Sequence, residues 1–234
     1  MMAFELADFR AVEEQAPRIK VLVGEFGSGK TELAVNLALY AQRSGLKTAV
    51  VDMDLIKPFF RTREHRQQLE AEGVTVVSPE SGLSHADLPI MPPNLTRVMF
   101  SPEYHVIMDV GGSKSAVVLG QLRHRLQENG CEVLMVVNTR RPFSSDAEGV
   151  LKAIRGVESV SGLRVTGLVS NTNLGGETTA DHVQEGLRVV NSVAENTGLP
   201  LRWLILPEWL YGSFTPPVPI LPLQPRTLYP WMEA

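Results

Sequence analysis

The run GEFGSGKTELAVNLA at residues 24–38 constrains the fold of this chain more than any other stretch. A glycine-rich turn stands there between an apolar run at 19–23 and a segment whose apolar residues have helical spacing. Four residues of the turn match the pattern G-x-x-x-x-G-K-[ST]: Gly24, Gly29, Lys30 and Thr31. A strand, a glycine-rich loop and a helix in this order are typical of a phosphate-binding loop, and the alternative is a turn that holds no ligand.

The loop offers each kind of group that the phosphates of a nucleotide need. Gly27 and Gly29 let the backbone bend so that its N–H groups surround the phosphates, and the start of the helix adds partial positive charge. Lys30 is expected to reach the β- and γ-phosphates, and the Thr31 hydroxyl is expected to bind Mg²⁺. The residues expected to bind the nucleotide here are Gly24, Glu25, Phe26, Gly27, Ser28, Gly29, Lys30, Thr31 and Glu32.

Short apolar runs alternate with helical patterns along the chain. We expect strands at 19–23, 48–52, 74–77, 106–109, 133–138, 165–170 and 201–206. We expect helices at 31–44, 61–72, 116–128, 147–160 and 180–196, each with a glycine just past its end. This alternation predicts an α/β fold, namely a doubly wound, mostly parallel sheet with helices on both faces.

Length and proline content bear on the domain organisation. With 234 residues, the chain is expected to form one nucleotide-binding domain over 1–234. Residues 78–93 are expected to form a loop, which is either a functional lid or partner surface or a plain surface connection. The proline-rich stretch at 211–234 can be neither a helix nor a central strand, and its apolar residues predict a tail packed on the domain.

Composition and charge argue against several classes of function. The net charge is −4 and no block of Lys and Arg is present, which argues against a nucleic-acid partner. Cys131 is the one cysteine, so a single chain can form neither a disulfide nor a cysteine-based metal site, although two copies of the thiol could meet in a dimer. His85 and Asp87 could bind a metal, but lone histidines in loops usually do not.

The chain carries no pattern that indicates a membrane or an export route. Its apolar runs are too short to span a bilayer, and its first residues are mixed and acidic, unlike a signal peptide. We therefore expect no membrane partner and a cytoplasmic location.

Acidic residues follow two of the expected strands. Asp52 and Asp54 end the second strand and would share one face of it. Asp109 ends the apolar run VIMD, where it would hold Mg²⁺, and the glycines after it would let the next loop approach a γ-phosphate. Doubly wound sheets place their ligands at such carboxyl ends. The alternative for Asp109 is a turn or helix N-cap residue.

Base recognition is expected from a later strand end. The run VTGLVSN ends at Asn171, whose side-chain amide can pair with the N6/N7 edge of adenine. The guanine-specific pattern N-K-x-D is absent after this strand, which favours ATP over GTP. An asparagine in an ordinary turn is the alternative.

Taken together, five motifs of the chain resemble the MinD/ParA/CobQ group of P-loop NTPases over about residues 18–210. They are the phosphate loop with its helix, DMD after the second strand, VIMDVGG, VSNTNL and LPEW. The resemblance is still nearer to stand-alone "CobQ/CobB/MinD/ParA nucleotide-binding domain" proteins. It implies a three-layer sandwich that binds ATP or ADP with Mg²⁺. It implies catalytic roles for Lys30, Asp52 and Asp54, and metal binding by Thr31, Asp52 and Asp109. It also implies that Asn171, Pro207 and Glu208 surround the base.

One position departs from this group. Many members carry a second lysine just after the first glycine of the loop, and this lysine reaches across an ATP-bound dimer, but Glu25 stands there in this chain. A carboxylate cannot stabilise a developing phosphate anion, so catalysis by a lysine from a partner subunit is in doubt. Arg140 and Arg141 could supply positive charge instead, or they could be surface arginines. The amphipathic membrane tail of MinD proteins is absent as well.

Three functions are compatible with these residues. The first is an ATP-binding protein, a slow Mg²⁺-dependent ATPase that acts as a nucleotide-dependent switch or accessory factor for a partner protein. In such a switch, the loops at 57–63 and 111–115 would sense the γ-phosphate. The second is an ATP-dependent small-molecule ligase or kinase-like enzyme of the dethiobiotin synthetase/CobQ type. The third is a nucleotide sensor that does not hydrolyse ATP, which Glu25 favours. A homodimer is compatible with each of them.

Overall fold

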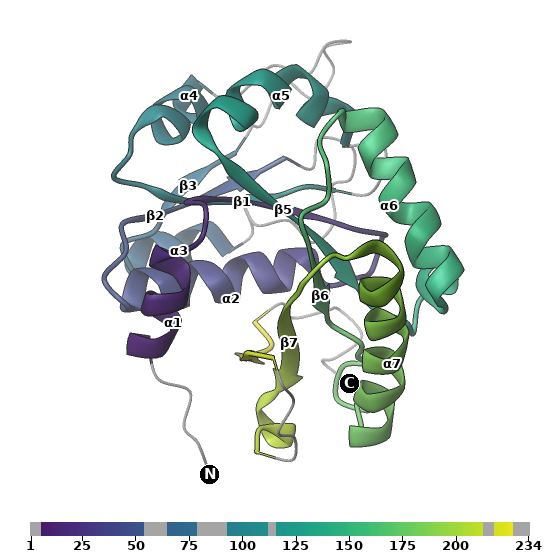
Figure 1. Cartoon of the computed structure of the whole chain (residues 1–234). Coiled ribbons are helices and arrows are strands. Elements are labelled where there is room, and N and C mark those ends of the chain that lie inside the picture. The colour runs from purple at the N-terminus through teal and green to yellow at the C-terminus, as the bar shows by residue number, and fades with distance from the viewer. Residues whose placement is uncertain (1–5, 54–64, 79–92, 112–115, 213–217, 227–234) are drawn as a thin grey trace.

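The computed structural model describes residues 6–53, 65–78, 93–111, 116–212 and 218–226 (Figure 1). Several predicted features lie outside these residues: Asp54, the loop at 57–63, His85, Asp87, most of the loop at 78–93, and the four positions 112–115. Among the helices of these described residues, none combines the length and the hydropathy that spanning a bilayer requires.

The described strands form one sheet in which every pair is parallel. Their order is β3-β2-β4-β1-β5-β6-β7-β8. The strands are β1 (Ile19–Val23), β2 (Thr48–Asp52), β3 (Thr75–Val77), β4 (His105–Asp109), β5 (Cys131–Val137), β6 (Gly167–Ser170), β7 (Leu201–Pro207) and β8 (Ile220–Leu223). The first strand therefore lies near the centre, and the loop that follows it lies between the ends of two neighbouring strands.

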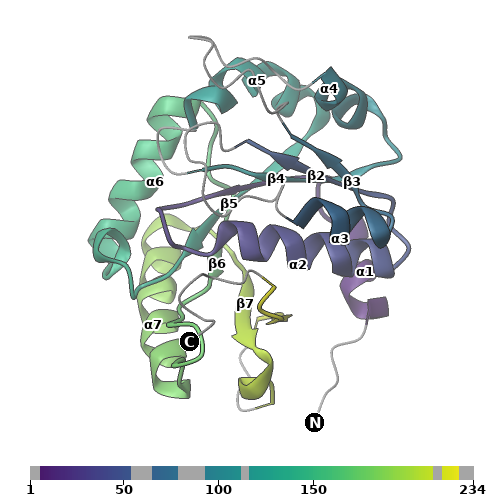
Figure 2. The same cartoon turned by 180° about the vertical axis from the view of Figure 1, so that it is seen from behind.

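Helices cover both faces of this sheet, and the two views from opposite sides agree on this (Figures 1 and 2). One face carries α1 (Leu6–Glu14), α2 (Lys30–Arg43) and α3 (Arg66–Ala71). The other carries α4 (Pro93–Phe100), α5 (Ala116–Asn129), α6 (Ala147–Ser161) and α7 (Ala180–Thr197). Two short 3₁₀ helices, η2 (Pro142–Ser144) and η3 (Glu208–Leu210), follow β5 and β7. The predicted fold class is confirmed.

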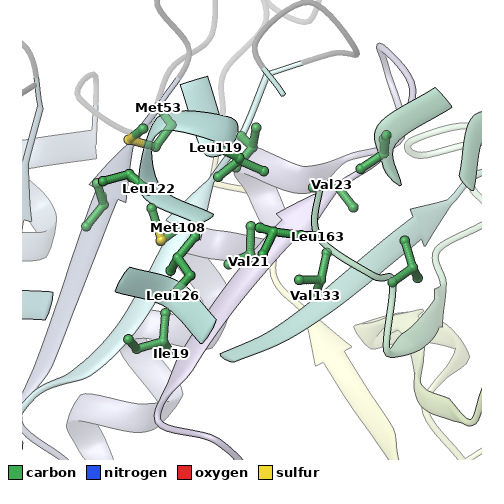
Figure 3. Close-up of a cluster of buried hydrophobic side chains, with 14 of the residues drawn as sticks. Ile19, Val21, Val23, Met53, Met108, Leu119, Leu122, Leu126, Val133 and Leu163 are labelled. Carbon is green, nitrogen blue, oxygen red and sulfur yellow. The ribbon is translucent and has the colours of Figure 1, made fainter. Parts of the chain in front are cut away.

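Alternate side chains of β1 enter different cores, because successive residues of a strand point to opposite faces. Val21 and its neighbours on this face pack with Met108 of β4 and against Leu122 of α5 (Figure 3). Leu22 packs on the opposite side, against Leu33 of α2. Burying each such side chain contributes about 1.5–3 kcal/mol. The central strand and the phosphate loop after it are therefore anchored from both faces.

Ionisable side chains, most of them buried, gather at the amino ends of the strands, away from the phosphate loop. Lys20 in β1 is fully buried, and its Nζ lies 2.9 Å from Oε2 of Glu13 in α1 and 3.1 Å from Oε2 of Glu132 in β5. His105 Nε2 lies 2.9 Å from the same oxygen of Glu13, and Arg202 Nε lies 2.6 Å from Oε1 of Glu132. We call these five residues the buried ion network. It joins α1, β1, β4, β5 and β7.

Candidate functional site

The glycine-rich turn leads from β1 directly into α2, as the motif predicts. Gly29 stands at the N-cap of α2 with a left-handed backbone, φ 87° and ψ 21°. A Cβ at Gly29 would lie 2.3 Å from Nδ2 of Asn171, so a larger residue would be both strained and obstructed. Because glycine has no side chain to cap the helix, the first N–H groups of α2 face the loop, which is the arrangement that binds anions.

The Lys30 side chain lies over this loop. Its Nζ donates hydrogen bonds to the carbonyl oxygens of Gly24 and Glu25, both at 2.9 Å, and lies 3.4 Å from Oγ of Ser28. Only 7% of Lys30 is exposed. The loop thus holds one positive charge at its centre.

Two buried carboxylates lie beside the loop. Oγ1 of Thr31 donates a hydrogen bond of 2.7 Å to Oδ2 of Asp109 at the end of β4. Asp52 at the end of β2 is the register partner of Asp109, and the next N–H, from Met53, donates to the Asp109 carbonyl at 2.9 Å. Thr31, Asp52 and Asp109 are therefore brought together by adjacent strands and the start of α2.

This donor set fits Mg²⁺. Among the described residues, no three side chains of the His, Cys, Asp and Glu types gather as a protein metal cage. Mg²⁺ does not require one, since it usually keeps several waters and binds one or two protein oxygens together with substrate phosphates. The Thr31 hydroxyl and the Asp109 carboxylate are the groups that would hold it, with Asp52 next to them.

Asn171, which we predict to contact adenine, lies at the end of β6 and makes contact with the loop. Its Nδ2 donates a hydrogen bond of 2.8 Å to the Ser28 carbonyl, and only 3% of the residue is exposed. Asn173 Nδ2 donates back to the Asn171 carbonyl at 2.8 Å. The amide N–H group of Asn171 thus supports the phosphate loop, and its contact with adenine stays a prediction.

Pro207 and Glu208 end β7 and begin η3, where they neighbour the loop that follows β6. Trp209 Nε1 donates to the Thr178 carbonyl at 3.3 Å, which joins the two loops. The Glu208 carboxylate accepts a hydrogen bond from the side chain of Gln224, just after β8. The predicted base-flanking residues therefore lie on one side of the molecule with Asn171, next to the C-terminal segment.

Of the other predicted loop contacts, Glu32 binds the C-terminal segment and Phe26 is exposed. Oε1 of Glu32 accepts a hydrogen bond of 2.6 Å from the backbone N–H of Arg226, so its carboxylate holds the C-terminal segment. Phe26 is 67% exposed at the tip of the loop.

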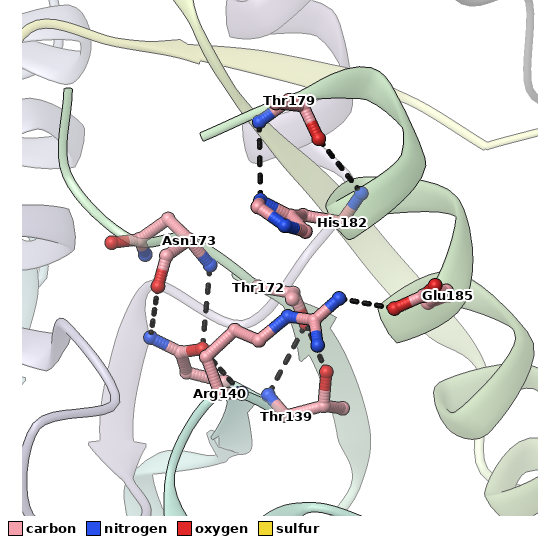
Figure 4. Close-up of polar contacts among 8 residues, drawn as sticks. Thr139, Arg140, Thr172, Asn173, Thr179, His182 and Glu185 are labelled. Carbon is pink, nitrogen blue, oxygen red and sulfur yellow. Dashed lines mark hydrogen bonds and ion pairs between the residues drawn. The ribbon is translucent and has the colours of Figure 1, made fainter. Parts of the chain in front are cut away.

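Sequence reasoning missed a polar network that joins the ends of β5 and β6 (Figure 4). Asn138 donates through Nδ2 to the Asn173 carbonyl at 3.1 Å, and Thr139 N donates to Oγ1 of Thr172 at 3.2 Å. A Cβ at Gly186 of α7 would lie 2.0 Å from that hydroxyl, so the helix packs closely on it. The sequence signal that could have revealed this network is the polar residues directly after two apolar runs, NT at 138–139 and NTN at 171–173.

Two adjacent arginines after β5 have different partners. Arg140 forms an ion pair with Glu185 of α7 (Figure 4). Arg141 instead donates from Nε to the Gly27 carbonyl of the phosphate loop at 3.0 Å.

Solved structures with the same fold come from several organisms. The cell division protein FtsY of Thermotoga maritima matches with a TM-score of 0.57 and 18% identity, over 82% of this chain and 62% of that one. The 54 kDa signal recognition particle protein of Aeropyrum pernix, in complex with GDP, matches with a TM-score of 0.51 and 20% identity, over 85% of this chain and 45% of that one. FtsY of Elizabethkingia anophelis, also in complex with GDP, matches with a TM-score of 0.52 and 17% identity, over 87% of this chain and 64% of that one.

This chain spans less than two thirds of the length of each of these three proteins. At such identities, the likeness shows the fold alone. No curated protein matches the chain.

A match to a family model identifies the family of this chain. The model described as the CobQ/CobB/MinD/ParA nucleotide binding domain matches residues 21–201, which is most of the chain. The matched stretch includes the phosphate loop, Asp52, Asp109 and Asn171. The resemblance expected from the sequence motifs is confirmed: the chain belongs to the CobQ/CobB/MinD/ParA nucleotide-binding domain family.

Proposed function

We propose that this protein binds ATP with Mg²⁺, hydrolyses it slowly, and acts as a nucleotide-dependent switch or accessory factor for a partner protein. The observation that carries this proposal is the placement of Lys30 over the loop, with Thr31 bonded to Asp109 beside it. These groups can hold a triphosphate and its metal ion at one edge of the sheet.

In the proposed reaction, a water oxygen bonds to the γ-phosphorus, and the bond to the bridging oxygen breaks. The electron pair stays on ADP, and the proton of the water passes to the phosphate product. Lys30 and the loop N–H groups stabilise the charge on the transferred group, and Asp52 orients the water. Mg²⁺, when bound at Thr31 and Asp109, neutralises phosphate charge. The second predicted acid, Asp54, lies outside the described residues.

ATP is proposed rather than GTP because the chain lacks the guanine-specific pattern after β6. Leu174 stands where N-K-x-D would place its aspartate. Amide groups of Asn171 and Asn173 lie at that strand end, and Pro207 and Glu208 end the next strand. Amide side chains can pair with the N6/N7 edge of adenine.

A partner protein is proposed because large apolar side chains are exposed in the phosphate loop and in the turn that carries Arg141. Phe26 is 67% exposed and Phe143, two residues after Arg141, is 74% exposed. Exposed aromatic residues of this kind are typical of protein interfaces. The partner could be a second copy of the chain.

A non-hydrolysing sensor is the second candidate, and Glu25 favours it. This residue places a carboxylate in the loop where many family members carry a catalytic lysine, and a carboxylate repels a phosphate anion. Phosphate release distinguishes the two candidates, because a sensor binds nucleotide without turnover.

Lys30→Ala tests the proposal by isothermal titration calorimetry with ATP, ADP and GTP in the presence of Mg²⁺. We expect the wild type to prefer ATP to GTP, and we expect Lys30→Ala to weaken ATP binding at least about tenfold, because a hydrogen bond to a charged group contributes about 1.5–3 kcal/mol.

Lys47→Ala is the matched control for this experiment. Lys47 is exposed, pairs with Glu103, and precedes β2 at the opposite end of the sheet. Its replacement should leave ATP binding unchanged. Absence of nucleotide binding by the wild type, or equal binding by wild type and Lys30→Ala, would contradict the proposed function.

A further inference from the structure

Arg141 is held rigidly at the start of the turn after β5. Its N–H donates to the Asn138 carbonyl at 3.2 Å, and its own carbonyl accepts from the Ser144 N–H at 3.1 Å. The Ser144 hydroxyl donates to the same Asn138 carbonyl at 2.8 Å. Pro142, with its restricted backbone, begins η2 directly after Arg141. The backbone of Arg141 is thus braced on both sides.

The side chain of Arg141 extends from this turn onto the phosphate loop. Its Nε donates to the Gly27 carbonyl at 3.0 Å. A Cβ on Gly27 would lie 2.9 Å from that Nε and 3.2 Å from Cδ of Arg141, and the Gly27 backbone has a φ of +78°. The loop therefore needs glycine at position 27 both for its bend and for the approach of the arginine.

The charge of Arg141 is not neutralised within the part of the chain that the structure describes. Arg140 pairs with Glu185, whereas no described carboxylate lies within ion-pair distance of Arg141. A guanidinium has five N–H donors, and Arg141 uses only the one on Nε with described residues. Its two Nη groups are therefore available to an anion beside Gly27.

We propose that Arg141 is the second cation of the phosphate site and contacts the terminal phosphate of ATP from within the same chain. This rests on the proposed function. Glu25 occupies the position from which many relatives supply a lysine in trans, and a guanidinium held on Gly27 restores positive charge to the loop. Its planar pair of N–H donors fits two phosphate oxygens. During hydrolysis, as the bond to the bridging oxygen breaks, the Arg141 guanidinium stabilises the charge on the transferred group.

Arg141→Gln is the test variant, because glutamine removes the charge and keeps an N–H donor for the Gly27 carbonyl. We expect ATP affinity to fall at least about tenfold and ADP affinity to change less than about twofold, since ADP lacks the terminal phosphate. We expect the turnover rate to fall about a hundredfold, which is typical for loss of one donor to transition-state charge.

Arg140→Gln is the matched control. It removes an adjacent arginine that pairs with Glu185, and it should leave both affinities and turnover within about twofold of the wild type. Arg141→Lys keeps the charge and should retain more of the ATP preference than Arg141→Gln. Melting temperatures of all variants are measured first. If Arg141→Gln does not fold, Arg141→Lys carries the test, because a lysine lacks the planar pair of donors and should lower the ratio of ATP to ADP affinity below that of the wild type.

Chemical rescue separates a role at the phosphate from a role in shaping the loop. Guanidinium ion, added to Arg141→Ala far below the concentrations that unfold proteins, should restore part of the turnover and of the ATP preference. It should not rescue Lys30→Ala. Equal loss of ATP and ADP affinity without rescue would overturn the proposal and leave Arg141 as a brace for the loop.

The two proposals fail in different ways. If the wild type binds no ATP, the proposed function fails. If the wild type binds ATP and Lys30→Ala does not, while Arg141→Gln keeps the wild-type ratio of ATP to ADP affinity, only the role of Arg141 is wrong. This ratio decides the outcome even where turnover is too slow to detect.

Discussion

At the scale of single residues, the phosphate loop is shaped by contacts with side chains that are distant in sequence. Gly29 has space for no side chain because Asn171, directly after β6, donates to the neighbouring carbonyl of Ser28. Arg141 occupies the corresponding space beside Gly27. The two glycines thus serve the turn and also allow two polar side chains to reach the loop backbone.

Gly29→Ala should lower both stability and nucleotide affinity. The left-handed backbone costs about 1–2 kcal/mol for a residue with a Cβ, and the new atom would collide with Asn171. We expect the double variant Gly29→Ala/Asn171→Ala to recover part of the loss in unfolding free energy, because it removes the collision and keeps the strain. Urea unfolding measures this cycle. Strictly additive effects of the two changes would show that the side chains do not meet.

At the scale of elements, α2 connects the phosphate loop to the C-terminal segment. A polar row on this helix, Glu32, Asn36 and Tyr40, bonds to the backbone at residues 222–226. Asn36 makes two of these bonds, from Nδ2 to the Gln224 carbonyl at 3.0 Å and from the Gln224 N–H to Oδ1 at 3.1 Å. The segment is thereby aligned with the helix that begins at Lys30.

Asn36→Ala should destabilise the protein by about 1–3 kcal/mol, because it leaves both backbone groups of Gln224 without their partner. Asn196→Ala, on the exposed side of α7, is the control and should change stability by less than about 0.5 kcal/mol. Hydrogen exchange should show faster exchange at the Gln224 amide in the Asn36 variant alone. Unchanged exchange there would mean that the segment is held by β8 pairing and not by α2.

At the scale of the whole molecule, the buried ion network makes stability depend on pH. Burial alone would raise the pKa of Glu13, but the hydrogen bond from His105 and the charge of Lys20 outweigh it and hold the pKa below its ordinary value. A carboxyl group with a lowered pKa in the folded state stabilises the fold above its unfolded pKa. This contribution is lost as the pH falls through the folded pKa.

Glu13→Gln should therefore be less stable than the wild type at pH 7, by about 3 kcal/mol, because Lys20 loses one of its two carboxylate partners. Below the folded pKa of Glu13, the difference between the two proteins should shrink. Urea unfolding at a series of pH values from neutral to acid checks this. A difference that stays constant down to acid pH would mean that Glu13 is not the titrating group.

The fold and much of the loop could be predicted from the sequence because their signals are local. The bounds of β1 and β2 match the apolar runs, and α6 and α7 end before Gly162 and Gly198, which adopt left-handed backbones. Strand periodicity, helix spacing and glycine caps depend on residues within a few positions of one another.

Other elements carry weak local signals, and tertiary contacts hold them. The helix α1 has one large buried apolar residue, Phe9, which stacks on Trp203 of β7 and meets Tyr40 of α2. Strand β8 contains Pro222, and it forms because β7 offers it a free edge. The predictions did not include α1, α4 or β8, since partners remote in the chain stabilise them.

Local patterns in the sequence predict a mostly parallel α/β sheet, a phosphate-type loop at the end of its first strand, and acidic residues at the ends of two strands. Which side chains meet at that loop depends on tertiary contacts. Asn171 contacts Ser28 across 143 residues and Arg141 contacts Gly27 across 114. Strand order brings the ends of β1, β5 and β6 together, and no local pattern encodes a contact made through that order.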